Sequence, residues 1–204
     1  MTLQLGVLVS GTGSNLQAII DAIEKGELDA KIRLVLSNRP DAYGLVRAKK
    51  AGLPTLALAH NEFSSREKFD EKLVKSLKEA GVQWVALAGF MRVLTPVFLT
   101  AFADKIINIH PSLLPAFPGV NAQKQAFDYG VKVTGCTVHF VDQGVDTGPI
   151  ILQGSVAVKE SDSLEDLRAR ILKKEHQLFV EALSEISRGH VSVLERRVSV
   201  LRAT

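Results

Sequence analysis

The chain has 204 residues, of which 46% are hydrophobic and 23% charged, which fits one globular domain with a full core, or two lobes. Its net charge of +3 is scattered, since the densest basic clusters, Lys49-Lys50 and Arg196-Arg197, are pairs, whereas nucleic-acid binding needs several clustered cations. A single cysteine, Cys136, excludes an internal disulfide and fits a reducing compartment. No apolar run approaches the ~20 residues that span a bilayer, and the start of the chain lacks a basic leader. We therefore expect a cytoplasmic protein that binds neither nucleic acid nor membrane.

Strand and helix patterns alternate along the first hundred residues. Apolar runs between turns predict strands over residues 3–10, 32–36, 54–58 and 84–88. Apolar residues at helical spacing predict helices between these strands, one of which opens at Ser64 with Glu67 at the capping-box spacing. Alternating strands and helices predict parallel pairing with right-handed crossovers.

The alternation weakens in the second half. A short helix is expected from Thr95-Pro96, followed by a strand over residues 105–109. The apolar runs 134–141 and 149–158 suit an antiparallel pair, because only a glycine-rich turn joins them. Ser163 with Asp166 opens a long helix that ends at Gly189. The sequence thus predicts an α/β fold: one domain over 1–204 with a single open, mostly parallel twisted sheet flanked by helices, in which the second half completes the sheet of the first.

A glycine turn, Gly11-Thr12-Gly13-Ser14-Asn15, follows the first strand and opens a helix. Glycines let a backbone approach a ligand closely, and a helix start offers N–H groups and a positive dipole end, which favour a phosphate. A dinucleotide site would need a third glycine where Leu16 stands and an acidic residue after the second strand, and a Walker loop would need a lysine; all are absent. A monophosphate site is one reading, and a simple strand-to-helix turn is the other.

Asn108 and His110 stand two residues apart at the end of a strand, so their side chains share a face. Asp146 lies in the turn Gly144-Val145-Asp146-Thr147-Gly148 and could sit beside the imidazole. Acyl transfer to an amine needs a donor for the developing oxyanion and a group that manages protons. We expect Asp146 to raise the pKa of His110, so that the imidazolium stabilises the oxyanion. The competing interpretations are a hydrogen-bonded structural histidine and an aspartate that only forms an Asx turn.

Other reactive residues carry weaker signals. His139 lies in a strand pattern, where a structural or supporting role is favoured over direct chemistry. His60, His176 and His190 show no i, i+4 pairing with another ligand, so no metal site is expected. Cys136 falls in a buried strand pattern and is a poor candidate nucleophile.

Four segments together resemble the phosphoribosylglycinamide formyltransferases, a branch of the folate-dependent formyltransferases: 10–16 (Ser-Gly-Thr-Gly-Ser-Asn-Leu), 88–92 (Ala-Gly-Phe-Met-Arg), 108–115 (Asn-Ile-His-Pro-Ser-Leu-Leu-Pro) and 146–149 (Asp-Thr-Gly-Pro). The resemblance covers residues 3 to 190. It implies the formyltransferase fold, with a Rossmann-like mononucleotide-binding half over 1–100 and a catalytic, folate-binding half over 101–204. It also implies transfer of a formyl group from 10-formyltetrahydrofolate to the amine of phosphoribosylglycinamide in purine biosynthesis, without a metal.

The resemblance assigns residues to three roles. The catalytic trio would be Asn108, His110 and Asp146. The phosphoribosyl substrate would be held by residues of the glycine turn and by one helical carboxylate: Gly13, Ser14, Asn15, Leu16, Gln17 and Glu175. The folate would meet Arg66, Met91, Arg92, Val93, Leu94, Asn108, Val141, Asp142, Gln143, Gly144, Val145 and Asp146. For Glu175 the sequence alone would favour a solvated helix face, and for Arg66 an exposed first-turn residue.

One departure and three rivals remain. Residues 120–123, Val-Asn-Ala-Gln, lack the histidine often found near this loop in relatives. Formylation of methionyl-tRNA and hydrolysis of formyltetrahydrofolate would use the same trio, but each usually brings an additional domain. A nucleotide-binding module would explain the glycine turn but not the trio. The sequence leaves the oligomeric state open, although an exposed apolar segment from Phe98 to Phe102 would suit a homodimer.

Overall fold

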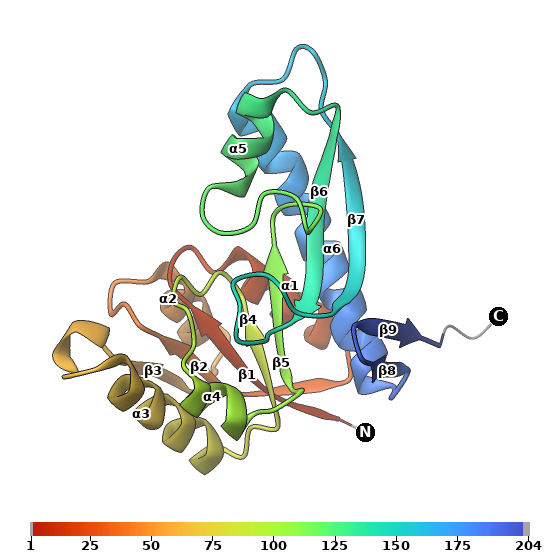
Figure 1. Ribbon diagram of the computed structural model, residues 1–204. Coiled ribbons are helices and arrows are strands. Elements are labelled where there is room, and N and C mark those ends of the chain that lie inside the picture. The colour runs from red at the N-terminus through yellow and green to blue at the C-terminus, as the bar shows by residue number, and fades with distance from the viewer. Residues whose placement is uncertain (1, 202–204) are drawn as a thin grey trace. The chain divides into compact units, whose positions relative to one another are not determined.

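The computed structural model describes residues 2–201 and divides the chain into two compact units, Met1–Asn108 and Ile109–Thr204. The first unit alternates strands and helices (Figure 1). Its elements are β1 (Leu3–Val9), α1 (Ser14–Glu24), β2 (Ala30–Ser37), α2 (Tyr43–Lys50), β3 (Thr55–Ala57), a 3-10 turn (His60–Glu62), α3 (Arg66–Glu79), β4 (Trp84–Leu87), α4 (Pro96–Ala101) and β5 (Ile106–His110), whose last two residues belong to the second unit.

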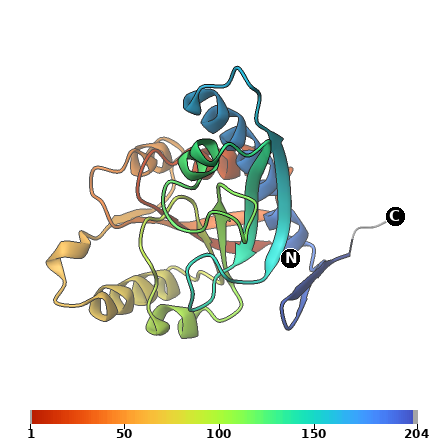
Figure 2. The same cartoon turned by 45° about the horizontal axis from the view of Figure 1, so that its top comes forward.

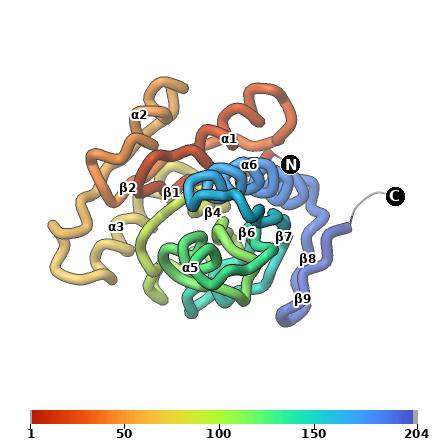
Figure 3. The backbone as a smooth tube through the Cα atoms, turned by 90° about the horizontal axis from the view of Figure 1, so that it is seen from above, coloured from red at the N-terminus to blue at the C-terminus, as the bar shows by residue number. Residues whose placement is uncertain are grey.

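The strands of the first unit pair in parallel. β1 lies between β2 and β4, β3 pairs with β2, and β5 pairs with β4. Figure 3 shows α1 and α2 on one side of these strands and α3 on the other, which explains why the side chains of Leu5, Val7 and Leu8 are all 0% exposed. The carboxyl ends of parallel strands share one edge of a sheet, where ligands of α/β proteins bind.

Two expectations for this unit are wrong in detail. The N-cap of α3 is Ser65, whose side chain accepts a hydrogen bond from the N–H of Lys68 at 3.1 Å, so the helix begins one residue later than the Ser64 capping box predicts. Phe98 and Phe102 are 0% and 5% exposed, and their ring centroids lie 5.4 Å apart. These rings contribute to the core and offer no exposed apolar surface for pairing two chains.

The second unit is built around one long helix. Its remaining elements are α5 (Ala122–Tyr129), β6 (Val133–Phe140), β7 (Ile150–Ala157), α6 (Leu164–Ser187), β8 (Val191–Leu194) and β9 (Arg197–Val200). β6 and β7 pair antiparallel, as predicted, and α6 packs against both strands and α5. Ser163 and Asp166 form the predicted capping box at the start of α6.

Seven strands form one sheet in the order β3-β2-β1-β4-β5-β6-β7. The predicted α/β fold with a mostly parallel sheet flanked by helices is therefore confirmed. The expectation that the entire second half completes this sheet is wrong, because β8 and β9 form a separate two-stranded sheet, visible as the hairpin that follows α6 in Figure 2. The helix α5 was not predicted, since Ala122 and Ala126 are its only buried residues and provide little apolar periodicity.

Candidate active site

Both ring nitrogens of His110 lie close to oxygen atoms within the second unit. Nδ1 is 3.2 Å from Oδ2 of Asp146, and Nε2 is 2.9 Å from the carbonyl oxygen of Phe117. The residue is only 4% exposed. The structure thus brings together His110 and Asp146, which are separated by the whole of α5 and β6. Asn108 precedes His110 by two residues on β5 and is half-buried.

The carboxylate of Asp146 is held from several directions. Its Oδ2 also accepts a hydrogen bond from the N–H of Gly119 at 2.8 Å, and its Oδ1 lies 3.6 Å from Nε2 of His139. The backbone of Asp146 is left-handed, with φ 56°, a conformation uncommon for residues other than glycine. These contacts span long sequence separations, unlike those of an Asx turn. The Asx turn in this loop is formed by Asp142, whose Oδ1 accepts from the N–H of Gly144 at 3.0 Å.

The backbone that faces His110 is fixed by buried hydroxyl groups. Ser112 is 0% exposed, and its Oγ donates to the carbonyl of Ala116 at 2.6 Å. Thr137 of β6 donates to the carbonyl of Ser112 at 2.7 Å and accepts from the N–H of Leu114 at 3.1 Å. Side chains of the antiparallel pair therefore hold the loop that delivers the Phe117 carbonyl to the imidazole.

Asp146 raises the pKa of His110 as expected, but the expected net rise is wrong. Burial lowers the pKa of His110 more than the Phe117 carbonyl and the charge of Asp146 raise it, so the net pKa lies below the ordinary value. For Asp146, burial alone raises the pKa. The contacts with His139, Gly119 and His110 together lower the pKa by more than burial raises it, so the net pKa lies below the ordinary value. The pair therefore combines an ionised carboxylate with a ring that gains a proton less readily than free histidine.

Three members of this cluster were not predicted as site residues: the Phe117 carbonyl, the Gly119 N–H and His139. The first two are backbone groups, which a motif of side chains does not reveal. His139 was favoured for a supporting role, and its contact with Asp146 agrees with that interpretation. The sequence held a signal for His139, because it lies one residue before the end of the strand that leads into the turn carrying Asp146.

The glycine turn of the first unit forms the start of α1. Gly13 is the N-cap with φ 68° and brings no capping side chain, so the first turn of the helix receives no side-chain carboxylate or hydroxyl at this position. A Cβ on Gly13 would lie 2.5 Å from Cα of Gly44, so only glycine allows this close approach of the turn to α2. The turn that the sequence predicts therefore depends on glycine at position 13.

The other predicted substrate residues differ in exposure. Ser14 and Gln17 are half-buried, whereas Asn15 is 7% exposed. Leu16 is 0% exposed, so its side chain belongs to the core and only its backbone is suited to ligand contact. Glu175 of α6 is 5% exposed, so the solvated-face interpretation of this residue is wrong.

The predicted folate residues lie in both units: Arg66, residues 91–94 and Asn108 in the first, and residues 141–146 in the second. In the first unit, Nη2 of Arg66 donates to the carbonyl of Val93 at 2.6 Å, so these two are in contact. Met91 is 73% exposed, whereas Leu94 is 6% exposed. In the second unit, residues 141–146 lie in the connection between β6 and β7. The same connection needs glycine at position 148, because a Cβ there would lie 1.8 Å from the carbonyl oxygen of Phe140.

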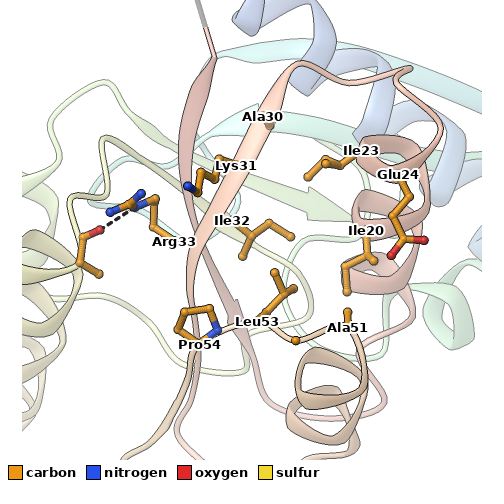
Figure 4. Close-up of a pocket in the computed structure, with 12 residues that line it drawn as sticks. Ile20, Ile23, Glu24, Ala30, Lys31, Ile32, Arg33, Ala51, Leu53 and Pro54 are labelled. Carbon is orange, nitrogen blue, oxygen red and sulfur yellow. Dashed lines mark hydrogen bonds between the residues drawn. The ribbon is translucent and has the colours of Figure 1, made fainter.

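A separate pocket of about 650 Å³ opens in the first unit. Ile20, Ile32 and Leu53 line it, with Glu24 and Lys31 beside them (Figure 4). It lies where β2 begins, whereas the predicted ligand segments follow strand ends. None of the predicted site residues lines this pocket.

Among residues 2–201, no group of three histidine, cysteine, aspartate or glutamate side chains has a geometry that could hold a metal ion. Within the same described part of the chain, no helix is both long and apolar enough to cross a bilayer.

The class of protein is a formyl transferase. The model of that family matches residues 3–183, and the chain belongs to the formyl transferase family.

Its relatives point to one branch of the family, as the sequence resemblance predicts. The chain is similar to the phosphoribosylglycinamide formyltransferase of Escherichia coli (strain K12), with 43% identity over 189 residues that cover 93% of this chain and 89% of that protein. A crystal structure of glycinamide ribonucleotide transformylase 1 from Symbiobacterium toebii matches with a TM-score of 0.97 and 50% identity, covering 98% of this chain and 95% of that one.

The chain is also similar to part of a larger protein. It is 49% identical over 188 residues to the trifunctional purine biosynthetic protein adenosine-3 of Drosophila melanogaster, covering 91% of this chain but 14% of that protein. The chain thus spans about a seventh of the length of that relative.

Proposed function

We propose that this chain transfers the formyl group of 10-formyltetrahydrofolate to the amine of phosphoribosylglycinamide, giving the N-formyl product and tetrahydrofolate in purine biosynthesis. Membership of the formyl transferase family supports the reaction class. The observation that carries the proposal is the contact of the buried His110 with the ionised Asp146. A buried imidazole with one carboxylate partner is suited to manage a proton during direct acyl transfer. The buried free thiol of Cys136 suits the reducing cytoplasm as the place of reaction.

The folate supplies the formyl carbon: a bond from the amine nitrogen to this carbon forms, the bond from carbon to N10 breaks, and one proton passes from the amine to N10. His110 is the group proposed to handle this proton. Its lowered pKa keeps the resting ring mostly neutral near pH 7, so the ring is able to accept a proton. Asp146 then stabilises the cation that forms.

The Phe117 carbonyl gives this step a second requirement. Nδ1 of His110 faces Asp146 and Nε2 faces the carbonyl; both oxygens are acceptors, so a neutral ring, which has one N–H, donates to only one of them. We propose that Nε2 exchanges the carbonyl for the reacting group, while Nδ1 stays on Asp146. Asn108, two residues earlier on β5, is proposed to donate an amide N–H to the developing oxyanion.

Substrate binding is assigned to the two units separately. In the first unit, Gly13 to Gln17 are proposed to hold the phosphate, supported by the uncapped start of α1. In the second, the buried carboxylate of Glu175 is proposed to accept hydrogen bonds from the ribose hydroxyls. The folate is proposed to lie against residues 91–94 and 141–146, and holding both reactants together contributes to the rate.

The test is a spectrophotometric assay of tetrahydrofolate release by the purified chain. Release that requires added phosphoribosylglycinamide is expected. Release without any amine would indicate a hydrolase, and release that requires methionyl-tRNA would indicate a tRNA-formylating enzyme; either result would overturn the proposal. The His110→Ala variant should lose at least about a hundredfold in rate, the scale of removing one transition-state donor.

A further inference from the structure

The chain between β4 and α4 is an irregular segment that three side chains hold at alternate residues. We call Met91–Thr95 the anchored segment. It contains neither helix nor strand, and Met91 and Val93 are 73% and 49% exposed. An exposed irregular segment is usually mobile, so the contacts that fix it bear directly on any ligand that it binds.

The first anchor is Ser10, the residue after β1. Ser10 is 4% exposed, and its Oγ accepts a hydrogen bond from the N–H of Met91 at 2.8 Å. The same hydroxyl donates to Oδ1 of Asn38 at 2.6 Å, and Asn38 is also 4% exposed. Because the hydroxyl hydrogen of Ser10 points to Asn38, a lone pair of the same oxygen is free to accept the hydrogen bond from the N–H of Met91.

The second anchor is Asp70 of α3, which is 3% exposed. Its Oδ2 accepts from both the N–H and the Oγ1 of Thr95, each at 2.7 Å. Burial raises the pKa of Asp70 more than Thr95, Arg66 and Arg92 lower it. A buried carboxylate is costly unless it is hydrogen-bonded, and Thr95 donates two hydrogen bonds to this one.

The third anchor is Arg66, whose guanidinium donates to the carbonyl of Val93 at 2.6 Å. The anchors therefore bind the backbone of residues 91, 93 and 95. These hydrogen bonds occupy the N–H of Met91, the carbonyl of Val93 and the N–H of Thr95. They therefore fix the path of the backbone from one end of the segment to the other.

We propose that Ser10 and Asp70 are positioning residues for folate: they fix the two ends of the anchored segment, so that its backbone meets the folate in a preset arrangement. This inference rests on the proposed function. Ser10 immediately precedes the glycine turn, so one residue borders the proposed phosphate segment and anchors the proposed folate segment. A preset backbone binds a ligand more tightly, because no ordering cost is paid on binding.

The experiment compares Ser10→Ala and Asp70→Ala with the conservative variants Ser10→Thr and Asp70→Asn, which retain an acceptor. Loss of one buried hydrogen bond should weaken 5,8-dideazafolate binding, measured by titration calorimetry, and raise the KM for the formyl donor about tenfold. The KM for phosphoribosylglycinamide should change less than about twofold, and the conservative variants should recover most of the folate affinity. Ser76→Ala is the matched control, since it removes an exposed hydroxyl bonded to the Lys72 carbonyl of α3.

Two negative results are distinguishable. Unchanged folate affinity in Ser10→Ala and Asp70→Ala, with a wild-type chain that transfers formyl groups, would overturn the positioning role alone. A wild-type chain that neither binds the analogue nor transfers formyl groups would overturn the proposed function together with this inference. If an alanine variant does not fold, the conservative variant at the same position is used instead. An equal rise in the KM for the formyl donor and the KM for phosphoribosylglycinamide in that variant would contradict the positioning role.

Discussion

The substitution Asp146→Asn tests the proposed chemistry most directly, because it removes a charge and keeps the shape of the side chain. Oδ2 of Asp146 is 3.2 Å from Nδ1 of His110. At an effective dielectric constant of about 20, unit charges at this separation attract by roughly 5 kcal/mol. Breaking a buried pair by removing one partner typically costs about 3–5 kcal/mol.

That energy is lost when His110 carries a proton in the transition state. Since each ~1.4 kcal/mol corresponds to a tenfold change in rate, kcat should fall by roughly 10²- to 4 × 10³-fold. The pKa of His110 should also fall further, because the charge of Asp146 is one of the influences that raise it. Formyl-transfer rates from about pH 5 to 9, with NMR titration of the imidazole, measure both effects.

The matched control is Asp162→Asn, which removes a carboxylate of the same unit that pairs with Arg170 at 2.5 Å and has a lowered pKa of about 2. This variant should keep its rate within about threefold, since the partner of Asp162 is Arg170 of α6 and not His110. The reasoning is refuted if Asp146→Asn retains a near-wild-type kcat, or if the pKa of His110 rises in that variant.

Two further predictions concern the turn and the pH dependence of stability. Gly148→Ala should lower the free energy of unfolding by about 1–3 kcal/mol in urea titrations, because its Cβ would lie 1.8 Å from the Phe140 carbonyl; an unchanged midpoint would contradict this. The folded-state pKa of His110 lies below its unfolded value, so stability should rise with pH up to about 6.5 and be lost as pH falls through the folded pKa. Urea midpoints across this window should depend less on pH in His110→Gln, and an equal dependence in both proteins would contradict the assignment.

The sequence was sufficient for most of the fold because apolar periodicity depends on local spacing. Strand β1 and helix α6 follow this rule, and the capping residues Ser163 and Asp166 can be recognised from their spacing in the sequence. Helix α5 was missed because it buries only two alanines. The hairpin of β8 and β9 was not assigned, since short exposed strands carry little apolar alternation.

The site divides in a similar way. The proximity of His110 and Asp146 follows from strand ends and a glycine turn, and the sequence predicts it. The Phe117 carbonyl and the Gly119 N–H belong to an irregular loop, whose path depends on Thr137 and on Gln153, which donates to the Leu114 carbonyl at 2.8 Å. Contacts of this kind join distant residues without any periodic signal, so one sequence does not reveal them.

The pKa of His110 shows why a charge partner alone does not determine protonation. Sequence reasoning considers the carboxylate, which raises the pKa, but burial acts on the same ring and outweighs it. The proposed proton transfer would benefit from this balance, because a proton acceptor must be unprotonated at rest and stabilised once it is charged. The low exposure of His110 favours the first property, and the nearby carboxylate of Asp146 favours the second.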